Sequence, residues 1–297
     1  MKRRSFFFHL GAGVAATVAS PSFSQANTVT RTTGKRSGRI PFQLGFAGYT
    51  FYHFNLDKSL EMIQKVDVHY LCIKDFHLPL DSGKERIRAF HEKCAKFGVT
   101  GYGVGPIYMG TRQEAKQAFD YARRVGVKLI VGVPFEWRTY KGRRCRCMSR
   151  GLLEYVDKLC KESDIKYAIH NHGPDMPELF PNAASVGEMI KGLDGRIGYC
   201  LDIGHEFRDG GDPVKAIHAC GERLFDLHLK NVTDSTRAGR AIELPRGKID
   251  LPAVARALCD IGYTGKCSLE YEKNMRAPFP GIVESIGYFR GILDTLR

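Results

Sequence analysis

The chain has 297 residues, of which 43% are hydrophobic, so it is long enough to bury one large core. The formal net charge is +13 at pH 7, but residues 1–40 carry a good part of it, and the rest of the chain is only mildly basic. Beyond this N-terminal part, no segment is apolar over the roughly 20 residues that span a bilayer, which excludes a membrane span in the mature form. We also expect no nucleic-acid partner.

The N-terminus has the layout of an export signal. A basic start is followed by an apolar stretch from Phe6 to Ala19 and by small residues at Ser24-Gln25-Ala26. The run Arg3-Arg4-Ser5-Phe6-Phe7 resembles a twin-arginine signal. An anchoring helix is the alternative, but polar residues and glycines interrupt the apolar stretch. We therefore expect a signal peptide over 1–26, a flexible leader over 27–40, and a periplasmic or extracellular mature protein.

After the leader, strand-like and helix-like segments alternate. Apolar runs of strand type occur near 42–48, 68–74, 99–106, 127–134, 166–172, 197–203, 224–230 and 266–271. Amphipathic stretches of helical period separate them at 56–66, 84–97, 111–125, 152–164, 213–221 and 251–261, and a last one covers 281–296. Gly98, Gly126 and Gly262 follow three of these helices, where a left-handed cap is expected.

Eight strands that alternate with helices predict parallel strands closed into a single-domain (β/α)8 TIM barrel over residues 41–297. The alternative is an open doubly wound sheet, but no G-x-G-x-x-G motif follows the first strand. Gly101, Gly103 and Gly105 alternate along the third strand, and we expect them to leave space for a ligand inside the barrel.

The densest basic segment follows the fourth strand. It contains Arg138, Lys141, Arg143, Arg144 and Arg146, with Arg150 close behind. We interpret it as a solvated loop because no aromatic residues interleave the charges, and contact with an anionic substrate or nucleic acid is the alternative. Trp137, the only tryptophan, is at the same rim, where it either stacks on a sugar ring or packs against the protein.

Four strands in the second half end with side chains that bind metals: His170, Asp202, His228 and Glu270. In each strand, residue alternation sends apolar neighbours such as Tyr167, Ile169, Leu201, Phe225, Leu227 and Leu269 to the opposite face. Functional groups of TIM barrels lie at the carboxyl ends of the strands, so these four side chains should meet there.

Such a cluster of imidazoles and carboxylates would be costly without a cation. Mixed nitrogen and oxygen ligands suit Mn, Zn, Co or Mg, and Mn is our first expectation. Glu136, two residues past Pro134 in the same register, is a reserve ligand or general base.

Further polar residues at strand ends suggest a sugar site. His172 follows His170 on the same face, and Lys230 follows His228. Lys74 ends the second strand, with His77 beyond it, and His205 lies three residues after Asp202. The lysines could polarise a carbonyl or exchange a proton, and ordinary ion pairs at the barrel mouth are the alternative.

Several motifs resemble the xylose-isomerase-like barrel superfamily, the sugar phosphate isomerase/epimerase group that also includes endonuclease IV. They are Leu201-Asp202-Ile203-Gly204-His205, Leu227-His228-Leu229-Lys230-Asn231, Arg246-Gly247-Lys248-Ile249-Asp250-Leu251, and Gly262-Tyr263 leading into Ser268-Leu269-Glu270-Tyr271-Glu272. The resemblance extends from about residue 42 to the C-terminus and implies a barrel with one divalent metal ion.

In ketose epimerases of this kind, the metal is held by Glu, Asp, His and Glu from the last four strands. Asp202, His228 and Glu270 match three of these positions, and His205 matches a histidine that contacts the substrate. His170 stands where the first glutamate is expected, so a symmetrical proton exchange between two glutamates is not implied.

We therefore expect a metal-dependent isomerase or epimerase, or a lyase on 3-keto-glycosides, that removes a proton next to a carbonyl. Glu270, His170 and Lys230 are the expected catalytic residues, and His205, His172, Lys74, His77 and Arg246 are expected to bind a sugar or keto-sugar. The alternatives are an endonuclease IV-like phosphodiesterase and a non-catalytic carbohydrate-binding barrel. Whether copies of the chain associate stays open.

Overall fold

The computed structural model describes residues 40–140 and 142–296. The predicted signal peptide and the predicted leader up to residue 39 lie outside the described residues. Within them, no helix combines the length and the apolar character needed to cross a membrane.

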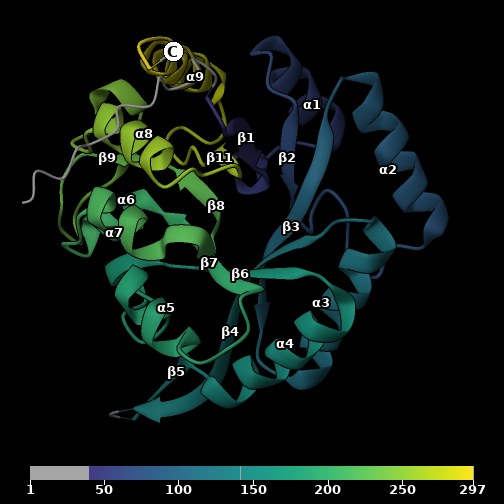
Figure 1. Ribbon diagram of the computed structural model, residues 1–297. Coiled ribbons are helices and arrows are strands. Elements are labelled where there is room, and N and C mark those ends of the chain that lie inside the picture. The colour runs from purple at the N-terminus through teal and green to yellow at the C-terminus, as the bar shows by residue number, and fades with distance from the viewer. Residues whose placement is uncertain (1–39, 141, 297) are drawn as a thin grey trace, which may run out of the picture. The chain divides into compact units, whose positions relative to one another are not determined.

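Eight parallel strands form a closed barrel (Figure 1). They are β1 (Gln43–Ala47), β2 (Tyr70–Ile73), β3 (Thr100–Met109), β4 (Leu129–Tyr140), β6 (Lys166–His170), β7 (Ile197–Asp202), β8 (Leu224–Leu229) and β11 (Lys266–Leu269). Each pairs in parallel with the next, and β11 pairs with β1, which closes the ring. The predicted (β/α)8 TIM barrel is confirmed.

Helices surround the barrel on its outside (Figure 1). They are α1 (Leu56–Lys65), α2 (Lys84–Lys96), α3 (Arg112–Val125), α4 (Arg150–Ser163), α5 (Ala183–Ile190), α6 (Ile203–Arg208), α7 (Pro213–Cys220), α8 (Leu251–Asp260) and α9 (Phe279–Asp294). Short 3-10 turns cover Gly48–Phe51, Gly173–Asp175, Gly221–Arg223 and Leu244–Arg246, and β9 (Asn231–Val232) pairs with β10 (Ala241–Ile242).

Local sequence explains several helix ends. Asn55, Thr111 and Ser149 precede α1, α3 and α4, and each side chain accepts a hydrogen bond from the backbone N–H three residues later. After α2, α3 and α8, glycines 98, 126 and 262 have φ values of 69°, 80° and 65°, so the predicted left-handed caps are present.

The apolar faces of the strands pack against the helices. Tyr167, Ile169, Leu201, Leu227 and Leu269 belong to this core, as their alternation predicted.

Phe225 does not follow that prediction. It packs inside the barrel with residues such as Val131, Ala168 and Cys200. The pairing of β7 with β8 shifts there: Tyr199 is opposite Leu224, but Cys200 is opposite Asp226. Phe225 is therefore an extra residue in β8, and a bulge of this kind breaks the strict alternation on which the prediction depended.

The glycines of β3 do not create the expected space. A Cβ atom at Gly101 would lie 2.5 Å from Ile73 Cδ1, and one at Gly105 would lie 2.1 Å from the carbonyl oxygen of Val131. Tyr102 fills the barrel interior between them, and its hydroxyl donates to Asp226 Oδ2 at 2.8 Å. These glycines permit close strand packing and do not form a ligand site.

The basic segment predicted as a loop forms a hairpin. The end of β4 pairs antiparallel with β5 (Arg143–Met148), and the register places Trp137 opposite Arg146 and Thr139 opposite Arg144. Phe135 and Trp137 therefore lie beside arginines of the facing strand. This cross-strand arrangement of aromatic and basic residues is not visible in the order of residues along one segment.

Candidate active site at the carboxyl ends of the strands

The four predicted metal ligands come together where their strands end. His170 ends β6, Asp202 ends β7, His228 lies near the end of β8, and Glu270 directly follows β11. Each offers a ligand atom within 4.8 Å of the others, and all four side chains are buried. We call these four residues the ligand group.

The distances within the ligand group centre on His170 Nε2. This atom lies 2.9 Å from His228 Nδ1, 3.8 Å from Asp202 Oδ2 and 3.9 Å from Glu270 Oε2. His228 Nδ1 in turn lies 3.2 Å from Glu270 Oε2. Two nitrogens and two oxygens therefore face one small volume.

This donor set fits a divalent cation. Asp202 Oδ1 accepts a hydrogen bond from the backbone N–H of His205 at 2.8 Å, which caps α6 and turns Oδ2 toward the ligand group. The neighbour of opposite charge that this buried Oδ2 has is the Lys230 ammonium, at 2.9 Å. Lys230 offers one positive charge to Asp202 and Glu270 together, and a divalent ion among the four donors would also compensate these buried carboxylates. Mixed imidazole and carboxylate donors suit Mn, Zn, Co or Mg.

Lys230 supplies a fixed positive charge beside the ligand group. Its Nζ lies 2.9 Å from Asp202 Oδ2, 2.8 Å from Glu270 Oε2 and 2.8 Å from Glu272 Oε2. Burial opposes the charge on Lys230, but these three carboxylates outweigh burial and raise the pKa of the ammonium well above its usual value. Lys230 is therefore a cation and hydrogen-bond donor at neutral pH, and not a base.

The two histidines of the ligand group differ in charge. Burial, with the nearby His228, lowers the pKa of His170 well below its usual value, so His170 is neutral. Burial also disfavours a charged His228, but the adjacent Glu270 outweighs it and raises the pKa of His228 to about 9.

The carboxylates differ as well. Burial raises the pKa of Asp202 to about 6. Burial acts in the same direction on Glu270, but Lys230 and His228 outweigh it and hold the pKa of the Glu270 carboxyl well below its usual range. Both carboxylates are therefore ionised at neutral pH, and Glu270 keeps its charge to lower pH than Asp202 does.

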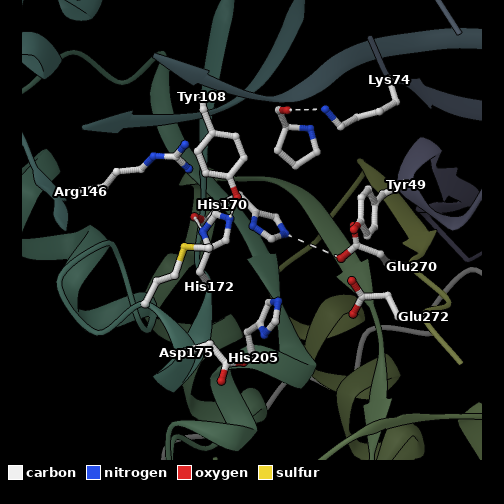
Figure 2. A pocket seen from close by; sticks show the side chains of 12 residues that line it. Tyr49, Lys74, Tyr108, Arg146, His170, His172, Asp175, His205, Glu270 and Glu272 are labelled. Atoms are coloured by element: carbon white, nitrogen blue, oxygen red, sulfur yellow. Dashed lines mark hydrogen bonds and ion pairs between the residues drawn. The ribbon is translucent and has the colours of Figure 1, made fainter. Parts of the chain in front are cut away.

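A cavity of about 420 Å³ opens above the ligand group (Figure 2). Ligand pockets of proteins have volumes of about 300–1,000 Å³, so a small molecule fits. The lining residues are Tyr49, Lys74, Pro106, Tyr108, Arg146, His170, His172, Asp175, Met176, His205, Glu270 and Glu272. Figure 2 shows Tyr108 and Arg146 on one side and Glu270, Glu272 and Tyr49 on the other.

Three of the predicted substrate-binding residues line this cavity: Lys74, His172 and His205. Lys74 Nζ pairs with Asp75 at 2.7 Å and donates to the carbonyl oxygen of Pro106 at 3.1 Å. Burial lowers the pKa of His172 to about 4 and that of His205 well below its usual value, so both rings are neutral.

Two further predicted residues and the reserve ligand lie elsewhere. His77 is buried away from the cavity, where its Nε2 lies 3.1 Å from both Ser59 Oγ and the carbonyl oxygen of Phe54. Arg246 is on the short turn before α8, and its guanidinium forms a bidentate pair with Glu284 at 2.7 Å.

Glu136 is in the hairpin. It accepts a hydrogen bond from Ser149 Oγ at 3.1 Å and pairs with Arg138. β4 continues past the barrel into the hairpin and carries Glu136 away from the ligand group. The expectations for His77, Arg246 and Glu136 are not supported by these positions.

Sequence reasoning missed a tyrosine–histidine pair in the cavity. His172 Nδ1 lies 3.1 Å from the carbonyl oxygen of His170, to which it must donate. His172 Nε2 is then the acceptor, and the Tyr108 hydroxyl donates to it across 2.5 Å. The hydrogen bond to the backbone therefore fixes the tautomer of His172. The only sequence signal for Tyr108 is its place near the end of β3.

Comparisons with known proteins agree with this architecture. The family model of the xylose isomerase-like TIM barrel matches residues 47–292. Among curated proteins, none matches the chain.

Solved structures with the same fold include D-psicose 3-epimerase from Clostridium cellulolyticum, determined with D-tagatose (17% identity, TM-score 0.62, 86% of this chain and 95% of that one). Another is a probable 3-DHS dehydratase from Bacillus anthracis (12% identity, TM-score 0.66, covering 84% of this chain and 99% of that one). A third is a xylose isomerase-like TIM barrel protein from Mycobacterium smegmatis in complex with magnesium (14% identity, TM-score 0.65, covering 86% of this chain and 97% of that one).

At these identities, the structural matches show a common fold and no more. The family model covers most of the chain, and its match coincides with the barrel that carries the ligand group. The chain therefore belongs to the xylose isomerase-like TIM barrel family.

Proposed function

We propose that this protein is a metal-dependent enzyme that removes a proton from the carbon next to a carbonyl group of a sugar or keto-sugar. The overall reaction is an isomerisation, an epimerisation or the elimination carried out by a keto-sugar lyase. The observation that carries the proposal is the ligand group itself: two imidazoles and two carboxylates, of which His170 and Glu270 line a cavity large enough for a sugar.

A divalent ion bound by the ligand group supplies Lewis-acid stabilisation of negative charge on a substrate oxygen. Removal of the proton needs a base within reach of the substrate. Glu270 is that base, because it is ionised at neutral pH and lines the cavity. Lys230 holds the Glu270 and Glu272 carboxylates in place and keeps a positive charge near the developing oxyanion.

His170 limits which reactions the site favours. An enzyme that inverts a carbon with two bases needs a proton acceptor on each face of the substrate. Here His170 faces Glu270 within the ligand group, and because burial lowers the pKa of His170 well below its usual value, this imidazole is a weak proton acceptor. Elimination needs only one base, so the asymmetry supports the lyase reaction at least as well as epimerisation. The sugar epimerase and the probable dehydratase among the proteins of similar fold support the two reaction classes.

The phosphodiesterase alternative has little support. Endonuclease IV-like chemistry uses several metal ions, whereas the described residues offer ligand sets that share His170 and His228 and lie in one place. A non-catalytic carbohydrate-binding barrel is separated from the enzyme by the following experiment.

The test is exchange of carbon-bound hydrogen in deuterated water. The protein is purified with its native metal content and incubated with a panel of free ketoses and 3-keto-glycosides, and deuterium incorporation next to the carbonyl is followed by NMR. We expect incorporation or elimination with at least one class, which is lost in Glu270→Gln and after chelation. Metal binding without any exchange or elimination across the panel would identify a binding protein and contradict the proposal.

We further propose that the enzyme acts outside the cytoplasm, which favours free over phosphorylated sugars as substrates. The support is the twin-arginine-like start of the sequence. Replacing Arg3 and Arg4 together with Lys should retain the protein in the cytoplasm of an expressing bacterium, as measured by cell fractionation. Unchanged fractionation would contradict the assignment.

A further inference from the structure

The hairpin of β4 and β5 holds one arginine against the cavity. In the antiparallel register, Arg146 is directly opposite Trp137. Its guanidinium carbon lies 5.4 Å from the Trp137 ring, 5.0 Å from the Phe135 ring and 5.1 Å from the Tyr108 ring. Three aromatic rings from two different strands therefore fix this guanidinium, and Figure 2 shows it pointing toward Tyr108 at the cavity wall.

In the described part of the chain, Arg146 has no partner of opposite charge. Among residues 40–140 and 142–296, no acidic side chain forms an ion pair with it and no group accepts a hydrogen bond from it. Two nearby arginines differ, because Arg138 pairs with Glu136 and Arg150 pairs with Glu154 at 3.0 Å. Arg144 also forms no ion pair with a described residue, but it does not line the cavity. The five N–H donors of the Arg146 guanidinium are therefore free to bind a ligand.

The other cations around the cavity are already compensated. Lys74 pairs with Asp75, and Lys230 contacts three carboxylates. Arg208 pairs with Asp175 at 2.7 Å. Arg146 is thus the cation of the cavity wall that lacks a partner, and it lies on the side opposite Glu270 and Glu272 (Figure 2).

We propose that Arg146 binds the carboxylate of an acidic keto-sugar, so that the substrates of this site are keto-sugar acids. The inference rests on the proposed function and adds the substrate class. A carboxylate matches a guanidinium fork in a planar, bidentate pair. With its carboxylate at Arg146, such a substrate presents its carbonyl end to the ligand group across the cavity. Among the residues that line the cavity, Arg146 is the guanidinium, and a single guanidinium is less suited to a dianionic phosphate, which proteins commonly bind at helix N-termini.

The single tryptophan gives a binding signal that does not depend on turnover. Trp137 is the only tryptophan of the chain and contacts Arg146, so its fluorescence reports on ligands at this position. The magnesium-loaded protein is titrated with D-fructuronate, D-fructose and D-fructose 6-phosphate, which share a ketose and differ at carbon 6. We expect D-fructuronate to bind about 10- to 100-fold more tightly than D-fructose, the size of a charge-assisted hydrogen-bonded pair.

The variants separate recognition from packing. Arg146→Gln should remove the preference for the acid, and Arg146→Lys should restore only part of it, because an ammonium lacks the fork. Arg144→Gln is the matched control: Arg144 also lies over Trp137, at 4.4 Å, but does not line the cavity, so the preference should persist.

Equal affinities for the acid and the neutral sugar, or a preference that survives in Arg146→Gln, would overturn the inference. A stronger preference for the phosphate, lost in Arg146→Gln, would overturn the carboxylate assignment. Deuterium exchange on neutral keto-sugars is measured separately, so a protein that exchanges hydrogen but ignores the carboxylate retains the proposed function and loses only this inference. A protein that prefers the acid but shows no exchange or elimination retains the carboxylate-binding role of Arg146 and loses the proposed function.

Discussion

Replacing Lys230 with Met should tighten the binding of a divalent cation. Lys230 Nζ lies 2.9 Å from Asp202 Oδ2 and 2.8 Å from Glu270 Oε2, and both oxygens belong to the ligand group. A cation bound by this group adds positive charge beside the ammonium. Met removes that ammonium but keeps a side chain of similar length in the buried position.

The size of the effect follows from Coulomb's law. Two unit charges about 4 Å apart interact by about 4 kcal/mol at an effective dielectric of 20 and by about 1 kcal/mol in bulk water. Movement of the lysine side chain relieves part of the repulsion, so we expect a gain of about 2–3 kcal/mol, or roughly 30- to 150-fold in the dissociation constant.

Calorimetric titration of chelator-treated protein with Mn²⁺ and with Mg²⁺ measures this gain. Lys74→Met is the matched control, because Lys74 lines the same cavity but pairs with Asp75 outside the ligand group. The affinity of the Lys74→Met variant for either ion should change by less than about threefold, since Asp75 already compensates the charge of Lys74. Circular dichroism shows whether each variant is folded. If Lys230→Met does not fold, Lys230→Gln is used in its place. Folded Lys230 variants that bind either ion no more tightly than the unsubstituted protein would refute the reasoning.

Three further predictions concern single residues. Asp202→Asn should weaken divalent-ion binding by about 100-fold or more in calorimetry, because a ligand charge is lost. The hydrogen bond from the His205 N–H should survive, since Asn also caps helices, and an unchanged affinity would show that Asp202 is not a ligand. Burial raises the pKa of Glu206 to about 7, so the folded state holds a proton that the unfolded state loses, and stability should fall as the pH rises from about 4.5 to 7. Glu206→Gln should remove this fall and be more stable by about 3 kcal/mol at pH 8 in urea unfolding, and a variant that keeps the pH dependence would contradict the assignment. Arg246→Gln should leave KM within about twofold and lower stability by no more than about 1 kcal/mol, because Glu284 engages Arg246 at the surface; a large rise in KM would restore Arg246 to the substrate site.

The fold and the ligand group were accessible from the sequence because their signals are local. The hydrophobic periods of strands and helices are visible within short segments of sequence. Alternation places His170, Asp202, His228 and Glu270 on the inner side of their strands. The closed parallel barrel then brings all strand ends to one face, so the convergence of these side chains follows from topology alone.

The walls of the cavity depend on contacts that alternation does not encode. His77 lies just past a strand like the true lining residues, but its ring turns to Ser59, which only the packing of α1 determines. Arg146 reaches the cavity because a hairpin pairs it with Trp137, and Tyr108 is identified by its bond to His172. Cross-strand pairing of this kind has no signature within a single segment.

The position of a bound metal ion decides whether the ligand group is a metal site. Crystals of the protein grown with Mn²⁺ and measured at the manganese absorption edge locate the ion by its anomalous scattering. We predict one strong peak within coordination distance of His170, Asp202, His228 and Glu270, and its loss in Asp202→Asn. A peak held by other residues, or no peak among these four at saturating Mn²⁺, would contradict it.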